Sequence, residues 1–134
     1  MRIVLAFGTF DLLHPGHVAY LRQAKKFGDR LIVVIARDKN VTKTKRHSTL
    51  FSENDRKKLV EALRDVDSAV LGSLGDALNI IKKIKPNTIC LGYDHDIDES
   101  SLALELSSMK TVPKIVRAKS YHAEKYKSSM LKKC

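Results

Sequence analysis

Apolar runs and amphipathic repeats alternate along the chain. Runs rich in Val, Ile, Leu and Ala predict strands, and segments in which apolar residues recur every three or four positions predict helices. The predicted strands are 2–7, 30–36, 66–72, 88–92 and 114–118. The predicted helices are 17–27, 53–64, 76–84, 99–108 and 124–132. Residues 38–51 are predicted to form a mobile, irregular loop rich in basic residues.

This alternation of strand and helix determines the predicted fold class. Almost wholly apolar strands, each separated from the next by a helix, are typical of a parallel sheet whose two faces are both covered. Right-handed crossovers then give an α/β domain, a Rossmann-like, doubly wound parallel sheet of about five strands flanked by helices. At 134 residues the chain is predicted to be a single domain, 1–134, with ligands outside the carboxyl ends of the strands.

Polar residues follow most of the predicted strands, where a ligand site is expected. These segments are 8-GTFD-11, 37-RDKN-40, 92-GYDHD-96 and 117-RAKSYH-122. The segment after the third strand, 72-GSLGD-76, is small and bland by comparison. We expect the basic loop over 38–51 to lie at the mouth of the site.

The connection between the first strand and the first helix contains two glycines, a proline and two histidines. Gly8 permits a sharp turn, so the amides of Thr9 and Phe10 come near the carboxyl edge of the sheet. His14 and His17 lie at the start of the helix, where the first-turn amides attract anions. Imidazoles can donate hydrogen bonds to phosphate oxygens without carrying a full charge. We interpret this connection as a phosphate cradle.

Two histidines three positions apart are also compatible with an ordinary helix start or with half of a metal site. A zinc site needs one or two further ligands. Cys90 lies in a predicted core strand, and the remaining histidines are scattered over positions 47, 95 and 122. The sequence therefore predicts no metal site built by the protein.

Composition and charge indicate a soluble globular protein with an anionic partner. Hydrophobic residues make up 43% of the chain and charged residues 30%, and the net charge is +10. Seven of the 25 Lys and Arg residues lie between Lys114 and Lys133, a balance that favours a nucleotide or a nucleic acid as partner. No apolar run approaches the roughly 18 residues that span a bilayer, and the start lacks the pattern of a signal peptide. A cytoplasmic location is therefore expected. Cys90 is predicted to lie in the core, and no role is assigned to Cys134.

The segment 8-GTFDLLHPGH-17 resembles the signature of the HIGH-motif nucleotidyltransferases, specifically their cytidylyltransferase-like group. Further similarities follow in order along the chain: 56-RKKLVEAL-63, 66-VD-67, 91-LGYD-94 and a serine pair near the end. Within the group, 33-VVIARDKNV-41, 69-AVLGS-73 and 115-IVRAKSY-121 are most similar to archaeal FAD synthetases. The resemblance implies that the single domain is a nucleotidyltransferase domain.

For an FAD synthetase, the resemblance implies transfer of AMP from ATP to FMN, which yields FAD and pyrophosphate. The acceptor phosphate attacks the α-phosphorus directly, and no covalent enzyme intermediate forms. Mg²⁺ or another divalent cation is expected, because the triphosphate brings negative charge that must be neutralised. Related small transferases are often dimers, which leaves a homodimer open.

The resemblance also implies roles for individual residues. The implied catalytic residues are His14, His17, Arg56 and Lys43, with Lys45 as the alternative lysine. The implied nucleotide-binding residues are Thr9, Phe10, His14, His17, Gly92, Asp94, Arg117, Ser128 and Ser129. Asp11 and Asp38 are implied on the acceptor side, and capping of local turns is the structural alternative for both.

Alternative functions stay open at this point, among them transfer from ATP to another phosphate acceptor such as phosphopantetheine or nicotinamide mononucleotide. Glycerol-3-phosphate cytidylyltransferases would use CTP and a polyol phosphate, but they typically have S-T-D where this chain has Ala36-Arg37-Asp38. Their R-T-x-G-I-S-T-T ending is also replaced by Arg117 followed later by 127-KSS-129. A non-catalytic nucleic-acid-binding module would suit the basic charge. The sequence has no RNP-like aromatic pair and no KH-type G-x-x-G loop, which argues against nucleic acid.

Overall fold

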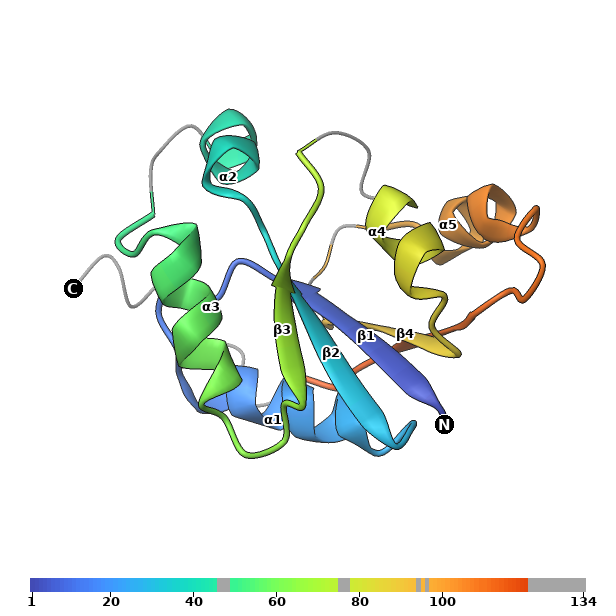
Figure 1. Ribbon diagram of the computed structural model, residues 1–134, viewed down its shortest axis with the longest axis horizontal. Coiled ribbons are helices and arrows are strands. Elements are labelled where there is room, and N and C mark those ends of the chain that lie inside the picture. Colours follow the sequence, from blue (N-terminus) through green and yellow to red (C-terminus); the bar gives the residue numbers. More distant parts are fainter. Residues whose placement is uncertain (46–48, 75–77, 94, 96, 121–134) are drawn as a thin grey trace.

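The computed structural model describes residues 1–45, 49–74, 78–93, 95 and 97–120, and within them five strands and five helices (Figure 1). The strands are β1 (Ile3–Gly8), β2 (Arg30–Ile35), β3 (Ser68–Leu71), β4 (Thr88–Leu91) and β5 (Lys114–Arg117). The helices are α1 (Pro15–Lys25), α2 (Asp38–Lys45), α3 (Glu53–Glu61), α4 (Leu78–Ile84) and α5 (Glu99–Leu106). None of these helices is long and apolar enough to cross a membrane.

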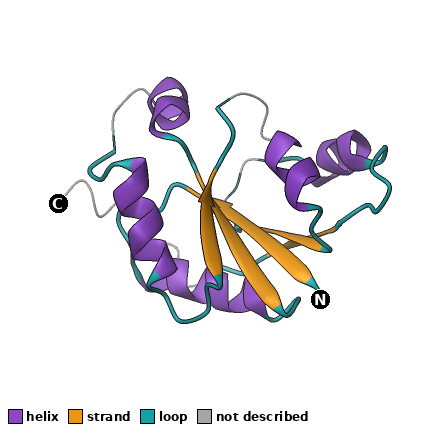
Figure 2. Cartoon of the chain, in the orientation of Figure 1, coloured by secondary structure: helices purple, strands orange, loops and turns teal. Residues whose placement is uncertain are grey.

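All five strands pair in parallel, in the order β3-β2-β1-β4-β5. The chain runs from β1 outwards through β2 to β3, and then returns to the other side of β1 for β4 and β5. Helices α1 and α3 pack on one face of the sheet, and α4 and α5 pack on the other (Figures 1 and 2). The predicted Rossmann-like, doubly wound α/β fold is confirmed.

Each face of the sheet has its own core. Val4 and Ala6 of β1 belong to the core beneath α1 and α3, whereas Leu5 between them belongs to the core beneath α4 and α5. Successive side chains of a strand point to opposite faces, so covering both faces requires an uninterrupted apolar run. Cys90 joins the first core, and burial raises the pKa of its thiol to about 11. The prediction of a core cysteine is therefore confirmed.

Local capping signals explain where several helices begin. Helix α1 starts two residues before its predicted start, because His14 is the N-cap and Pro15 suits the first helical position. Helix α3 starts after Ser52, whose hydroxyl accepts a hydrogen bond from the Asp55 N–H at 3.2 Å, as the Ser-x-x-Asp spacing predicts. The predicted helix over 124–132 lies outside the described residues.

The prediction of an irregular loop over 38–51 was wrong for its first half. Residues 38–45 form α2. The N-terminus of α2 is capped by Glu53, which lies 15 positions further along the chain and whose carboxylate accepts a hydrogen bond from the Asp38 N–H at 2.8 Å. A cap supplied from that distance leaves no local pattern in the sequence of the helix itself.

Candidate functional site

The candidate site lies at the carboxyl ends of the neighbouring strands β1 and β4. The helix that follows β1, α1, packs on one face of the sheet, and the helix that follows β4, α5, packs on the other. Pairing of β1 with β2 continues to Gly8, but pairing of β1 with β4 ends at Ala6 and Cys90. The two strands therefore stop pairing beyond that point, and we call this split in the edge of the sheet the crevice. Doubly wound sheets usually bind their ligands at such a split. The loop after β1 and the first residues of α2 and α3 lie at this edge in Figure 1.

Two imidazoles cap the first turn of α1. His14 Nδ1 accepts a hydrogen bond from the Gly16 N–H at 3.1 Å. His17 Nδ1 accepts a hydrogen bond from the His14 N–H at 3.3 Å. The two rings stack with their centroids 3.9 Å apart. The pair has the reciprocal form of a capping box, in which the usual residues are Ser or Thr and Glu or Gln.

These cap hydrogen bonds determine which ring nitrogen can donate. A nitrogen that accepts a hydrogen bond carries no proton, so neutral His14 and His17 each have their proton on Nε2. Both side chains therefore bring an Nε2–H donor to the positive end of the α1 dipole, beside the first-turn amides. Such a set of donors suits phosphate oxygens.

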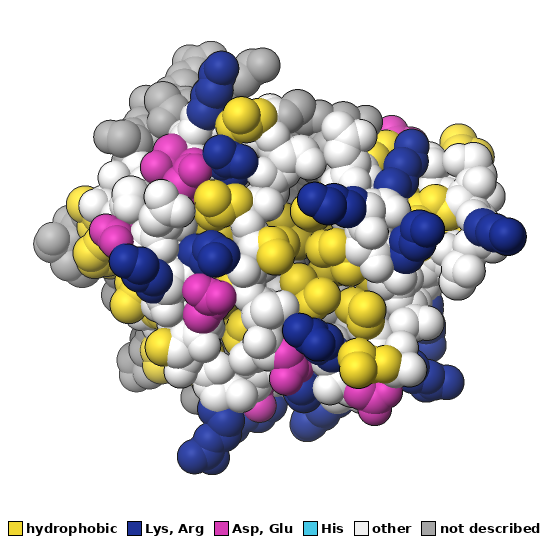
Figure 3. All heavy atoms as spheres, in the orientation of Figure 1, with side chains coloured by type: hydrophobic (Ala, Val, Ile, Leu, Met, Phe, Trp, Pro, Cys, Tyr) yellow, Lys and Arg dark blue, Asp and Glu magenta, His cyan; other side chains and the backbone are white. Residues whose placement is uncertain are grey.

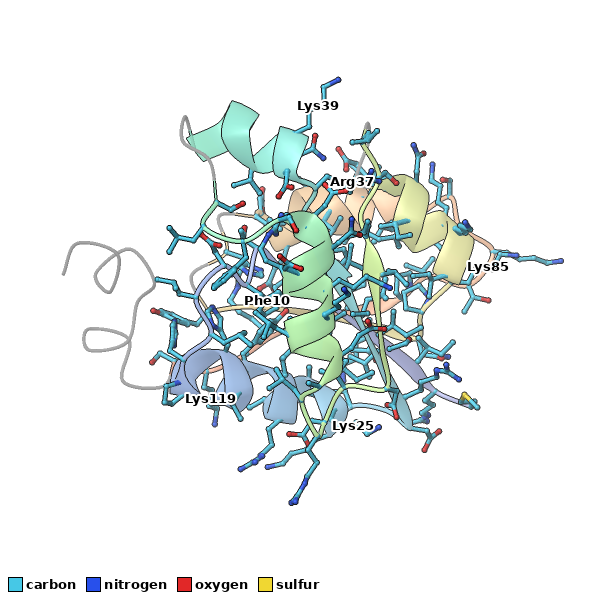
Figure 4. The ribbon with its side chains drawn as sticks, turned by 60° about the vertical axis from the view of Figure 1, so that its left-hand side comes forward. Phe10, Lys25, Arg37, Lys39, Lys85 and Lys119 are labelled. Carbon is cyan, nitrogen blue, oxygen red and sulfur yellow. The ribbon has the colours of Figure 1, made fainter. Side chains whose placement is uncertain are left out.

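Phe10 packs between Gly8 and His17. The Phe10 and His17 rings meet edge to face with centroids 5.3 Å apart. A Cβ on Gly8 would lie 2.5 Å from the Phe10 ring, so glycine is needed at that position. Phe10 is buried with φ at 55°, and Figure 4 shows it inside the molecule. Its side chain belongs to the scaffold, which leaves its backbone for the implied nucleotide contact.

Asp11 is a buried carboxylate bonded to backbone amides. Its Oδ2 accepts from the Leu50 N–H at 2.9 Å, and its Oδ1 accepts from the Phe51 N–H at 3.0 Å. These bonds join the loop after β1 to the segment that leads into α3. The structure thus gives Asp11 the turn-capping contacts that were the alternative to acceptor binding, and its acceptor contact stays a prediction.

Arg56 of α3 is fully buried, with 0% of its surface exposed. Its Nε donates to the Phe51 carbonyl at 3.1 Å. Its two terminal nitrogens donate to the Thr9 carbonyl at 2.8 Å and to the Asp38 carboxylate at 2.5 Å. The guanidinium therefore ties the loop after β1 to the starts of α2 and α3. This burial favours a positioning role, and the implied direct contact with phosphate stays a prediction.

Asp38 and Glu53 cap each other's helices. The Asp38 carboxylate accepts from the Glu53 N–H at 3.0 Å, reciprocating the bond that Glu53 accepts from Asp38. Arg37, labelled in Figure 4, adds an ion pair to Glu53 at 3.0 Å. Burial alone would raise the pKa of Asp38, but the Glu53 amide and the Arg56 guanidinium together hold this pKa below its usual value. Asp38 thus joins α2 to α3, and its acceptor role stays a prediction.

The link made by Asp38 is expected to be sensitive to acid. Because its pKa is lower in the folded protein, the carboxylate contributes stability above the ordinary value of 3.8, and this contribution is lost as the pH falls through the lowered pKa. Urea unfolding at about pH 6 and about pH 3 should therefore show a smaller loss of stability in Asp38→Asn than in the wild type. Asp65→Asn, which removes the carboxylate partner of the exposed Arg22, is the control and should behave like the wild type. Equal losses in all three proteins would contradict the role of Asp38.

Lys43 and Lys45 are both carried by α2, and their side chains lie outside the described part of the structure. Figure 1 shows α2 beyond the carboxyl ends of the strands. The helix that bears both lysines therefore begins at the site, where Asp38 and Glu53 anchor it. Contact of either lysine with a triphosphate stays a prediction.

Arg117 organises the segment that follows β4. Its terminal nitrogens donate to the carbonyls of Gly92 at 2.9 Å, of His95 at 2.8 Å and of Ile97 at 2.8 Å. Its Nε donates to the Glu99 carboxylate at 2.8 Å. These contacts indicate that Arg117 shapes this wall of the site, and they give no support to its implied direct contact with the nucleotide.

His95 and Glu53 are site residues that sequence reasoning missed. His95 Nδ1 accepts from the Gly92 N–H at 3.0 Å, and a Cβ on Gly92 would lie 3.0 Å from His95 Nε2. A glycine at a strand end followed three residues later by a histidine is the signal that could have pointed to this contact. The implied nucleotide-binding residues Asp94, Ser128 and Ser129 lie outside the described residues.

Basic side chains are dispersed over the face of the molecule shown in Figure 3, with Asp and Glu side chains among them. Nucleic-acid-binding domains generally gather Lys and Arg in a patch or stripe. This face provides no such stripe and so gives no support to a nucleic-acid-binding module.

Comparison with known proteins identifies the family. A family profile described as cytidylyltransferase-like matches residues 5–134. The chain belongs to the cytidylyltransferase-like family. The FAD synthase of Ferroglobus placidus is 46% identical over 117 residues, which cover 87% of this chain and 76% of the relative. The FAD synthase of Thermoplasma acidophilum is 42% identical over 130 residues, which cover 97% of this chain and 91% of the relative.

Solved structures agree with this assignment to the cytidylyltransferase-like family. The crystal structure of a protein described as a lipopolysaccharide core biosynthesis protein, from Thermoplasma volcanium, superposes with a TM-score of 0.85 at 41% identity. The match covers 90% of this chain and 98% of that one. Pantoate-β-alanine ligase from Francisella tularensis has a TM-score of 0.64 at 16% identity, covering 98% of this chain and 67% of that one, and shows the shared fold alone. The resemblance based on the histidine motif is confirmed.

Proposed function

We propose that this member of the cytidylyltransferase-like family is an FAD synthase, which transfers AMP from ATP to the phosphate of FMN and releases pyrophosphate. The observation that carries the proposal is the pair of histidine caps on α1 at the crevice between β1 and β4. Curated relatives of 40 to 47% identity named FAD synthase support the choice of ATP and FMN.

The paired imidazoles supply the electrostatic part of this reaction. A phosphate oxygen of FMN attacks the α-phosphorus of ATP, and the bond from that phosphorus to the β-phosphate oxygen breaks as pyrophosphate leaves. The Nε2–H groups of His14 and His17, with the first-turn amides of α1, donate to triphosphate oxygens and stabilise the charge that develops on them. The phosphates themselves supply the nucleophile and the leaving group, so the protein contributes alignment and charge stabilisation.

The charge network around the buried Arg56 holds together the segments from which the other contacts to substrate are expected. Arg56 and Asp38 hold the loop after β1 against α2 and α3, and α2 brings Lys43 or Lys45 to the triphosphate. On the opposite side of the crevice, the segment after β4 is expected to meet the base and ribose. Arg117 fixes the conformation of that segment.

The expected divalent cation fits this arrangement as a companion of the triphosphate. Within the described residues, no three His, Cys, Asp or Glu side chains converge to hold a metal. Both oxygens of Asp11 accept bonds from backbone amides. In this proposal the phosphates of ATP would supply most ligands of Mg²⁺, and the ion would neutralise part of their charge.

Pyrophosphate release tests the proposed reaction and the cytidylyl alternative together. With Mg²⁺ present, ATP and CTP are each paired with FMN and with glycerol 3-phosphate. The proposal predicts release only with ATP and FMN. Release only with CTP and glycerol 3-phosphate would keep the mechanism and overturn the substrates, whereas no release in any of the four mixtures would contradict the proposal.

Two further parts of the proposal concern the protein in the cell. ATP and FMN are cytoplasmic metabolites, so a cytoplasmic location is retained. A homodimer is the assembly suggested by the dimers common among small transferases. Light scattering on the purified full chain measures the molar mass, and a monomer at all protein concentrations would contradict the dimer.

A further inference from the structure

One side chain of α1, that of Tyr20, contacts the two neighbouring strands β1 and β4. Its hydroxyl accepts a hydrogen bond from the Phe7 N–H at 3.1 Å and donates one to the Cys90 carbonyl at 2.5 Å. Phe7 belongs to β1 and Cys90 to β4, and Tyr20 is 9% exposed. The hydroxyl therefore lies in the core and joins one helix to two strands.

These contacts lie where β1 and β4 separate. The β1–β4 pairing ends at Ala6 and Cys90. In contrast, β1 stays paired with β2 to Gly8, and β4 stays paired with β5 to Leu91. The Tyr20 hydroxyl thus bonds to both strands at the base of the crevice that forms the candidate site.

The position of Tyr20 on α1 links the place where β1 and β4 separate to the helix start that carries His14 and His17. Tyr20 follows His17 by three residues, so the two side chains lie on the same side of the helix. A hydroxyl bonded to both strands limits the rotation of α1 and its sliding along the helix axis. It therefore limits the positions that His17 can take relative to the crevice.

The same ring also contacts the opposite wall of the site. His95, in the segment after β4, meets the Tyr20 ring edge to face with centroids 5.8 Å apart. Through Nδ1, His95 also accepts the Gly92 N–H at the end of β4. Tyr20 therefore lies between the element that carries the histidine pair and the segment expected to meet the base.

We propose that Tyr20 is a positioning residue of the nucleotide site, whose hydroxyl fixes the histidine-bearing start of α1 relative to the segment after β4. The proposal rests on the proposed function, because ATP is the ligand that the two walls hold. Packing alone does not require the hydroxyl, since a phenyl ring would fill the same core space.

Tyr20→Phe removes the hydroxyl and keeps the ring that contacts His95. Because misplacement of catalytic groups by about 1 Å can cost up to about 100-fold in rate, we expect kcat/KM for ATP to fall by roughly 10-fold or more. The matched control is Thr88→Val. This change also removes the hydroxyl of a buried residue, but Thr88 lies at the amino end of β4, opposite the end where the site lies. At a temperature where all proteins are folded, Thr88→Val should keep kcat/KM within about twofold of the wild type.

A double-mutant cycle separates positioning from general destabilisation. The measured quantities are kcat with ATP and FMN and the Kd of α,β-methylene ATP, an unreactive analogue, in the wild type, Tyr20→Phe, His17→Asn and the double variant. If the hydroxyl acts through His17, Tyr20→Phe lowers kcat less in the His17→Asn background than in the wild type. Strictly additive losses, unchanged kcat/KM in Tyr20→Phe, or an equal loss in Thr88→Val would overturn the proposal. Failure of the wild type to bind the analogue would instead overturn the proposed function on which it rests.

Discussion

Replacing His17 with alanine is expected to lower kcat for adenylyl transfer by about 10²- to 10³-fold, the usual cost of removing one well-placed donor from a transition state. The Nε2–H of this ring is a donor because its Nδ1 already accepts the His14 N–H. The loss should fall mainly on kcat, since the donor is needed most when charge develops on the phosphate oxygens. Steady-state kinetics with ATP and FMN measure it.

Alanine also removes the cap that His17 makes for α1, so a second variant is needed to separate catalysis from folding. The Asn side chain places its oxygen near the position of the histidine Nδ1 and has no group that reaches the position of Nε2. His17→Asn should therefore retain the cap to the His14 N–H and most of the stability, yet lose activity as severely as alanine. Near-wild-type kcat in His17→Asn would contradict the role assigned to the Nε2–H donor.

Replacing Arg56 with methionine is expected to lower the free energy of unfolding by about 3 kcal/mol. The guanidinium is fully buried, and its loss leaves the carbonyls of Thr9 and Phe51 without these donors and Asp38 without its ion pair. For a chain of this size, the melting temperature should fall by about 10 °C. Urea unfolding and calorimetry measure the two quantities.

The chain offers a matched control in Arg22→Met. Arg22 is also an arginine on a helix with an acidic partner, but its side chain is 62% exposed and lies 3.5 Å from Asp65. Exposed pairs of this kind contribute little, so the change in unfolding free energy should stay below about 0.5 kcal/mol. Arg56→Lys should be intermediate, because one ammonium group cannot reproduce three separately directed bonds. Equal effects of Arg56→Met and Arg22→Met would contradict the buried network.

The parts of the molecule that could be predicted from the sequence are those specified locally. The strands are continuous apolar runs because each is buried on both faces, as Val4, Leu5 and Ala6 illustrate. The placement of His14 and His17 at the start of α1 could be predicted, because the two residues are three apart at the boundary between an apolar run and a helical repeat, and they cap the same turn. In both cases the information lies within one element.

The parts that could not be predicted depend on contacts between distant segments. Helix α2 was missed because Glu53 caps it from a later helix. Arg56 looks like an exposed helix residue beside Lys57 and Lys58, yet its partners Thr9 and Asp38 lie far away in the sequence. Such partners give a buried charge its stability, and no periodicity reports them.

The roles of Arg117 and His95 were hidden for a related reason. Arg117 is the last residue of β5, and a polar residue at the carboxyl end of a strand is usually taken to face a ligand. Its donors are instead bonded to carbonyls of the segment after β4, one of them that of His95. Distinguishing a side chain that binds substrate from one that shapes the wall of the site requires the hydrogen-bond partners, which the fold alone brings together.

The most direct test of the central claim follows the α-phosphate of ATP. The purified full chain is incubated with Mg²⁺, FMN and ATP labelled either at the α-phosphorus or at the γ-phosphorus, and the products are separated. Attack of FMN on the α-phosphorus predicts that the α-label appears in FAD and the γ-label appears in pyrophosphate. Absence of the α-label from any flavin product, with the ATP unconsumed or its label in another compound, would contradict the proposed function.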